Sequence, residues 1–307
     1  MKYLIAILFV AFCLQCQAQF PDYYVYMVTG DVTIIKPGAK PIAVEQKQLV
    51  YKNDVIAVKK GGEITLLDKD ANYFLLNTAG NYTNVAIKSR SKTHSEGITR
   101  KYLRFLFDEL INPDHDFEKF KKENIAGVWG GVERSEEECE NRIFPINGLK
   151  TSAASIVFRW HKSSPSSNYS FVIYDAAVKE LFSTNVKDSL YAVNVNETLH
   201  GIQGKYFWRV TSDDGNCEKE VPIYFDILTP ENEKKQVEQF VTANGNENLE
   251  IKLQQIDKLE KNAYINGAAE NYAALVKAYP DNKALLKSYV SFLLKYGFDK
   301  EAKAVWK

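Results

Sequence analysis

The chain has 307 residues, of which 45% are hydrophobic and 25% are charged, a composition typical of folded globular domains. Its 39 Lys and Arg side chains are balanced by 39 Asp and Glu side chains. Because there is no surplus of positive charge, the sequence does not favour binding to nucleic acid or to an anionic membrane surface. A chain of this length is expected to form two or three domains.

Residues 1–18 have the pattern of a secretory signal peptide. A positive charge precedes the apolar run of residues 4–14, and cleavage is expected after Ala18. The run is too short to span a bilayer, and no later stretch resembles a transmembrane segment. We therefore expect an exported protein without a transmembrane span, either periplasmic or otherwise associated with the cell envelope, or secreted. The alternatives are a buried N-terminal helix, an uncleaved anchor, and lipid modification of Cys13 or Cys16.

Residues 19–90 alternate apolar and polar side chains in short stretches separated by turn residues, which predicts an all-β sandwich or barrel. Residues 30–32 (Gly-Asp-Val), 53–56 (Asn-Asp-Val-Ile) and 66–68 (Leu-Leu-Asp) resemble the corresponding parts of a FecR-like β-domain. The resemblance implies a periplasmic module. Members usually relay signals on membrane-anchored chains, and the sequence offers no anchor for such a relay.

Residues 91–140 are expected to form a helical connector followed by an acidic linker. Apolar side chains recur every four residues from Ile98 to Leu110, and Pro113 is expected to end this helix. A second short helix would place Phe117 and Phe120 on one face. Residues 133–140 are mostly acidic, which favours a solvated linker.

Residues 141–230 return to the alternation of strands. Residues 145–148, 158–160 (Phe-Arg-Trp) and 206–210 (Tyr-Phe-Trp-Arg-Val) resemble a fibronectin type III or related immunoglobulin-like domain in order and spacing. The resemblance implies that Trp160 is a core tryptophan and that Tyr206 lies at a corner of the sandwich. The alternative is that Trp160 or Trp208 is exposed and stacks on a ligand.

Two cysteines, Cys139 and Cys217, remain after removal of the signal peptide. An even pair in an oxidising compartment favours a disulfide over two free thiols. In a domain of the fibronectin type III kind, this bridge would fasten the acidic linker to the sandwich.

Residues 231–307 have helical periodicity. Ala268, Tyr272 at +4 and Leu275 at +7 resemble the second helix of a tetratricopeptide repeat. Ala302 follows Ala268 by the length of one such repeat, and Gly297 falls where the turn between helices requires glycine. The resemblance implies one full repeat at 249–282 and part of a second at 283–307; a plain helical hairpin or bundle is the alternative.

An array this short is difficult to stabilise, because such repeats bury their faces by stacking and about three are normally needed. We therefore expect the helices to pack on the β-sandwich, to be completed by another chain, or to be truncated. The expected fold is multi-domain, β then α. It has two all-β sandwich-like domains joined by a helical segment, and a C-terminal α-helical hairpin or repeat region.

The sequence contains no recognisable catalytic motif. None of the four histidines has a metal-ligand spacing, and neither a nucleophile elbow nor a phosphate-binding loop is present. Residues 68–70 (Asp-Lys-Asp) are better explained as a β-turn than as a calcium loop. We therefore expect no cofactor, no metal site, no catalytic residue and no enzymatic activity.

The hypothesis favoured by these observations is an exported scaffold or adaptor of the cell envelope that binds a protein or peptide through its modules. The repeat resemblance implies a binding face on the first helix of each repeat. Its residues are Glu250, Leu253, Asp257, Glu260, Lys287, Ser291 and Leu294. The first alternative is a glycan-binding protein that stacks sugars on exposed loop aromatics such as Tyr23, Tyr24 or Trp129. A secreted hydrolase ranks below both.

Overall fold

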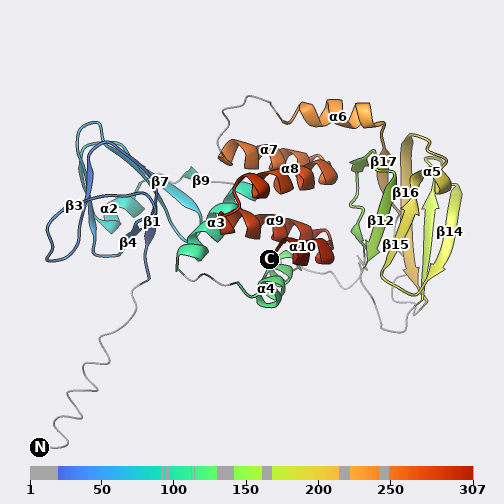
Figure 1. The fold of residues 1–307 in the computed structure, drawn as a ribbon, viewed down its shortest axis with the longest axis horizontal. Helices are drawn as coiled ribbons and strands as arrows, with labels where there is room; N and C mark the ends of the chain where they lie inside the picture. Colours follow the sequence, from blue (N-terminus) through green and yellow to red (C-terminus); the bar gives the residue numbers. More distant parts are fainter. Residues whose placement is uncertain are drawn as a thin grey trace, which may run out of the picture. The chain divides into compact units, whose positions relative to one another are not determined.

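The computed structural model consists of β-sheets followed by C-terminal helices, which confirms the coarse expectation (Figure 1). It describes residues 20–90, 93–94, 97–111, 113, 115–129, 142–160, 168–213, 222–241 and 249–306. The signal sequence, the acidic stretch, Cys139 and Cys217 lie outside these ranges, so export, the linker and the disulfide stay predictions. The chain divides into two compact units, Met1–Glu96 with Leu103–Pro113, and Gly97–Tyr102 with Asp114–Lys307.

The first unit is built from two antiparallel sheets, whose strand orders are β4-β1-β6-β7-β9 and β3-β2-β5-β8. Alternate side chains of the strands are buried together, among them Ile34, Ile56 and Ile64, each 0% exposed. The elements are β1 (Tyr23–Thr29), β2 (Val32–Ile35), β3 (Ile42–Ala43), β4 (Leu49–Val50), β5 (Val55–Val58), β6 (Glu63–Leu67), β7 (Asn72–Leu76), β8 (Gly80–Tyr82), α2 (Asn84–Lys88) and β9 (Thr93–His94).

Two turns of this unit follow directly from their residues. Gly30 has a φ of +70°, and a Cβ there would lie 2.7 Å from the carbonyl oxygen of Gly61, so only glycine fits. Asp68 accepts hydrogen bonds from the backbone N–H groups of Asp70 and Asn72, both at 2.9 Å. This is the expected β-turn, and its carboxylate is used by the turn itself.

The helix α3 (Gly97–Ile111) ends two residues before Pro113, as its sequence predicts. It belongs to both units, since its first turns up to Tyr102 group with the second unit. There the Tyr102 hydroxyl accepts a hydrogen bond from the Asn282 side chain at 3.1 Å.

The β-part of the second unit has a three-stranded sheet of order β10-β12-β15 and a five-stranded sheet of order β11-β17-β16-β13-β14. Trp160 and Trp208 are 2% and 0% exposed, and the ring of Phe158 lies 5.1 Å from that of Trp208. Both tryptophans are therefore core residues and cannot stack on a ligand. The elements are β10 (Arg142–Phe144), β11 (Leu149–Thr151), β12 (Ser155–Trp160), β13 (Tyr169–Tyr174), β14 (Glu180–Val186), β15 (Leu190–Asn194), α5 (Val195–Thr198), β16 (Gly204–Ser212) and β17 (Ile223–Ile227).

The Tyr206 hydroxyl donates a hydrogen bond to the carbonyl oxygen of Ile202, four residues upstream, at 2.7 Å. A tyrosine that closes a corner of a β-sandwich in this way is what the sequence predicts at this position.

The C-terminal helices form two pairs with a constant spacing. α9 (Lys283–Lys295) begins one repeat length after α7 (Leu249–Lys261), and α10 (Asp299–Val305) begins the same distance after α8 (Ile265–Ala278). The turn within each pair uses a left-handed residue, Ala263 at φ 63° and Gly297 at φ 72°, which are separated by the same spacing. The sequence predicts this turn for Gly297. Its counterpart Ala263 adopts the same conformation although alanine does so at a cost.

A segment from much earlier in the chain extends this stack. α4 (Phe117–Trp129) packs on α9, where the ammonium of Lys287 lies 5.9 Å from the ring of Phe120 and Ser291 donates to the Asn124 side chain at 3.3 Å. Both partners advance by four residues, so α4 and α9 run parallel.

α4 also packs against α10, and here the two helices point in opposite directions. Glu118 contacts Lys303 at 3.2 Å, and Lys121 contacts Asp299 at 2.5 Å, so the two helices run antiparallel. Since α7 and α9 belong to successive antiparallel hairpins, they also run parallel to each other. α4 therefore occupies the place that the first helix of a third pair would take.

The β-sandwich of the second unit is joined to the helices by direct contacts. The Lys150 N–H donates to the carbonyl of Ala263 at 3.1 Å, and the Asn266 side chain donates to Thr151 at 2.9 Å. The guanidinium of Arg159 lies 4.4 Å from the centre of the Phe298 ring. The helix α6 (Pro230–Glu238) leads from the sandwich to the pairs and contacts Tyr264 through Gln236. Of the three outcomes expected for a short array, packing on the sandwich is the one observed.

Candidate functional site

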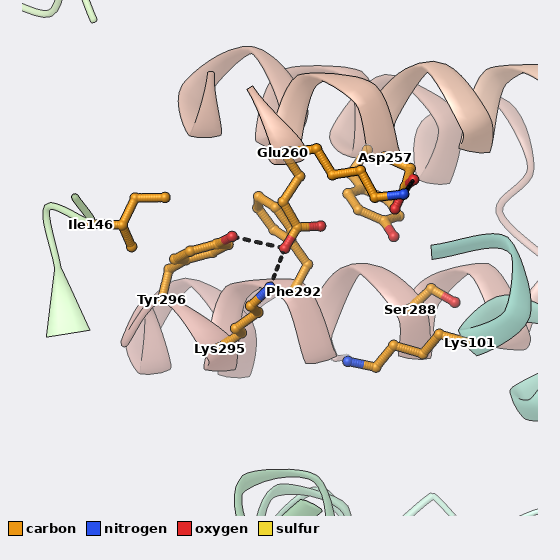
Figure 2. A pocket seen from close by; sticks show the side chains of 10 residues that line it. Lys101, Ile146, Asp257, Glu260, Ser288, Phe292, Lys295 and Tyr296 are labelled. Carbon is orange, nitrogen blue, oxygen red and sulfur yellow. Dashed lines mark hydrogen bonds and ion pairs between the residues drawn. The ribbon is translucent and has the colours of Figure 1, made fainter. Parts of the chain in front are cut away.

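A cavity of about 440 Å³ lies between α7 and α9 in the second unit (Figure 2). Each of the two helices contributes residues spaced to share one face. Those of α7 are at i, i+3 and i+4, and those of α9 with its C-cap are at i, i+4, i+7 and i+8. The lining residues are Lys101, Ile146, Asp257, Glu260, Lys261, Tyr272, Ser288, Phe292, Lys295 and Tyr296.

Glu260 organises one side of the cavity. Its Oε1 accepts hydrogen bonds from Lys295 Nζ at 2.5 Å and from the Tyr296 hydroxyl at 2.7 Å (Figure 2). Its side chain is only 13% exposed, whereas that of Lys295 is 43% exposed. The ammonium therefore reaches in from solvent and compensates the charge of a largely buried carboxylate.

Asp257 lies one turn before Glu260 and pairs with Lys261 of the same helix at 2.6 Å. The cavity thus contains three lysines and two carboxylates, which leaves one net positive charge when all are ionised. Both carboxylates thus have a cationic neighbour.

Tyr272 contributes to the cavity from α8. The residue is 1% exposed, and its hydroxyl forms no hydrogen bond with another residue of the described part of the chain. Burial first, and then the charges of Glu260 and Asp257, raise its pKa well above the usual tyrosine value. Tyr272 therefore stays protonated and presents a hydrogen-bond donor.

The structure divides the predicted binding residues into two groups. Asp257 and Glu260 line the cavity, and Glu250 is partly exposed. The other four are buried, which is a correction to the expectation of an open binding face. They are Leu253, Lys287, Ser291 and Leu294, at 0%, 5%, 1% and 7% exposure.

The predicted binding residues are buried for different reasons in α7 and in α9. Lys287 and Ser291 are covered by α4, which lies against the face of α9 that the sequence assigned to a partner. Leu253 is a core residue of α7. The sequence of α9 could not have revealed this burial, because Lys287, Ser288 and Ser291 lie on one side of the helix and give it the polar character of an exposed face.

Most cavity residues outside α7 could not be found by sequence reasoning. Lys101 comes from α3 and Ile146 from the segment before β11, and no local pattern connects either to α7. The remaining residues of α9 and its C-cap lie on the face next to the one predicted. They are Ser288, Phe292, Lys295 and Tyr296.

The aromatic residues suggested for sugar stacking do not support that role. Tyr23 and Tyr24 are 1% and 2% exposed because they begin β1 and do not lie in a loop. The side chain of Trp129 lies outside the described residues. The glycan-binding alternative thus loses the two residues that the structure tests.

The described ranges of the chain contain no group of three or more His, Cys, Asp or Glu residues placed to hold a metal ion. They also contain no helix with the length and apolar character needed to cross a bilayer.

No protein-family model matches the chain, and no curated protein matches it. Among solved structures, the chain is similar to PorZ, an essential bacterial surface component of the type-IX secretion system of Porphyromonas gingivalis, with 15% identity and a TM-score of 0.23. The match covers 62% of this chain and 26% of that one, so the chain spans about a quarter of the length of PorZ. At this TM-score the similarity carries no argument about fold or function.

Proposed function

We propose that the chain is an exported, non-enzymatic scaffold or adaptor of the cell envelope that binds a protein or peptide partner through α7. The observation that carries this proposal is the difference in exposure between α7 and α9. α7 keeps Gln254 and Lys258 exposed and Glu250 partly exposed, whereas their counterparts in α9, which are Ala284, Ser288 and Phe292, are buried.

The attachment of the helices to the β-sandwich supports the same role. Hydrogen bonds from Lys150 to Ala263 and from Asn266 to Thr151 join the two parts of the second unit. A partner bound at α7 would therefore be held at a defined position relative to the sandwich, which is what an adaptor requires.

In-cell photo-crosslinking tests this proposal. A photoreactive amino acid replaces Gln254 or Lys258 in the full chain, and crosslinked partners are identified by mass spectrometry. The control places the same group at Asn185, which is exposed on β14 of the sandwich. The proposal expects a discrete protein partner crosslinked from both α7 positions and absent at Asn185. Crosslinking from Asn185 alone, or from none of the positions, would contradict it.

A further inference from the structure

We propose that the outer face of the five-stranded sheet in the second unit is a binding site for a neutral glycan built of flat, β-1,4-linked pyranose rings. This goes beyond the proposed function, because it assigns a carbohydrate to the β-sandwich and does not depend on a protein partner at α7.

The first argument is a row of aromatic side chains on this face. Tyr174 of β13 lies opposite Phe207 of β16, and Phe207 lies opposite Tyr224 of β17. All three are partly exposed, whereas Tyr206 and Trp208, the neighbours of Phe207 along β16, are buried in the core. Because adjacent strands lie about 4.8 Å apart, the side chains form a straight row about 10 Å long across the sheet.

The second argument is that the protein leaves the cations beside this row available. Lys205 and Arg209 flank Phe207 on β16, and neither side chain forms a hydrogen bond or an ion pair with the part of the chain that the structure describes. Their contacts are with rings, since the ammonium of Lys205 lies 4.3 Å from the centre of the Tyr224 ring and the guanidinium of Arg209 lies 5.9 Å from that of Tyr174. Such contacts are weak at accessible sites, so both groups can donate hydrogen bonds to a ligand.

The same face also carries carboxylates, which act as acceptors. Asp226 lies opposite Lys205, and Glu180 lies opposite Tyr174 at the end of the row. One oxygen of Glu180 accepts a hydrogen bond from Ser183 at 2.6 Å, and the other can accept from a ligand. Donors and acceptors beside an apolar row match a sugar, whose hydroxyls both donate and accept and whose C–H faces pack on aromatic rings. An acidic peptide would be repelled by the two carboxylates.

The third argument is the shape of the row. Phe207 and Tyr224 lie 6.3 Å apart between ring centres, and Gly148 donates from its N–H to the carbonyl oxygen of Tyr224 at 2.8 Å. A Cβ at Gly148 would lie 3.1 Å from the Tyr224 hydroxyl, so glycine leaves room for this ring. A chain of β-1,4-linked pyranoses is a flat ribbon that can follow a straight row, whereas an α-1,4-linked chain curves away from it.

The experiment is isothermal titration of the mature full-length protein with three neutral β-1,4-linked hexasaccharides: cellohexaose, mannohexaose and N-acetylchitohexaose. The matched control ligand is maltohexaose, which has the glucose units of cellohexaose in α-1,4 linkage. We expect saturable binding of at least one β-1,4-linked hexasaccharide, with an affinity about tenfold or more above that of maltohexaose, since only a flat chain contacts the whole row.

Two variants test the residues assigned to the site. Phe207→Leu keeps an apolar side chain but removes the central ring, and it should weaken binding about tenfold. Arg209→Gln removes the charged donor and should weaken binding about fivefold. The control is Thr211→Val on the same strand and face, outside the aromatic row, which should leave the affinity unchanged. Circular dichroism of each variant confirms that it is folded.

The proposal is overturned if none of the three β-1,4-linked hexasaccharides binds saturably at millimolar concentration. Equal affinity for maltohexaose, or unchanged affinity of the folded Phe207→Leu protein, would also overturn it. Hexaglutamate serves as the peptide probe, and its binding in place of the sugars would assign the face to an acidic peptide and contradict the proposal. Each of these failures leaves the crosslinking test at α7 unaffected, because that test detects a protein partner at another surface.

Discussion

α7 and α9 hold equivalent places in successive helix pairs, yet their surroundings differ. Ile251 of α7 is 41% exposed, while Leu285, its counterpart in α9, is 0% exposed. α9 packs against α8, α10 and α4, so that almost every side of it is covered. Two helices in equivalent places of a repeating array can therefore differ in exposure, because the second has neighbouring helices on more of its sides.

The largest expected effect comes from truncating the matched pair Leu285 and Ile251. Leu285→Ala should lower the free energy of unfolding of the helices by about 3 kcal/mol, because it leaves a cavity in a closely packed core. Ile251→Ala should cost about 1 kcal/mol or less, since much of that side chain is already in water. Chemical denaturation followed by circular dichroism at 222 nm measures both. Similar losses for the two variants would remove the contrast between the helices.

The second prediction concerns the helix that covers α9. Phe120 is 7% exposed and its ring lies 4.6 Å from that of Trp306, so Phe120→Ala should lower the free energy of unfolding by about 2 to 3 kcal/mol. The control is Glu118→Ala on the same helix. It removes an ion pair whose side chains are both 70% exposed, and it should cost under about 0.5 kcal/mol. If Phe120→Ala proved as neutral as this control, α4 would not be part of the folded stack.

The third prediction uses the two left-handed turn residues. Gly297→Ala should lower the free energy of unfolding by about 1 kcal/mol, and Ala263→Gly should raise it by up to about 1 kcal/mol, because glycine adopts positive φ without the steric cost of a Cβ. Thermal unfolding of both variants provides the comparison. Changes of the same sign would show that the two turns are not equivalent.

The smallest change in the free energy of unfolding at neutral pH is expected for Glu260→Gln. The effect of this substitution becomes visible in alkaline solution. Burial, and then the charge of Glu260, raise the pKa of Tyr272 and of Tyr296 above the ordinary value of 10.0. An unfolded tyrosine loses its proton first, so the stability these residues contribute is full below pH 10 and is lost as the pH rises further.

Removing the Glu260 charge should lower both pKa values without restoring the ordinary one, because burial remains the larger cause. Absorbance of tyrosinate at 295 nm as a function of pH measures the shift, with Lys258→Gln on the exposed side of α7 as the control. Titration curves that do not change with Glu260→Gln would show that the charge of this carboxylate does not affect the pKa of either tyrosine.

Much of the fold could be predicted from local patterns, since alternation in the sheets and helical periodicity near the C-terminus depend on neighbours in sequence. Gly297 and Tyr206 were assigned correctly because one side chain or one backbone angle determines each role. The docking of α4 was not predictable, because the contact between Asn124 and Ser291 joins residues far apart in the chain. For the same reason only Asp257 and Glu260 of the cavity were anticipated, while residues from α3 and from the segment before β11 were not.

The central claim is that α4 folds against α9 and covers it while α7 stays accessible. Hydrogen–deuterium exchange of the mature full-length protein, followed by mass spectrometry of peptides from α4, α7 and α9, tests this directly. The account predicts that amides of α4 are protected together with those of α9, and that Phe120→Ala releases the protection of α4 while that of α7 remains. Exchange of α4 at the rate of an unfolded segment in the unmodified protein, with α9 still protected, would contradict it.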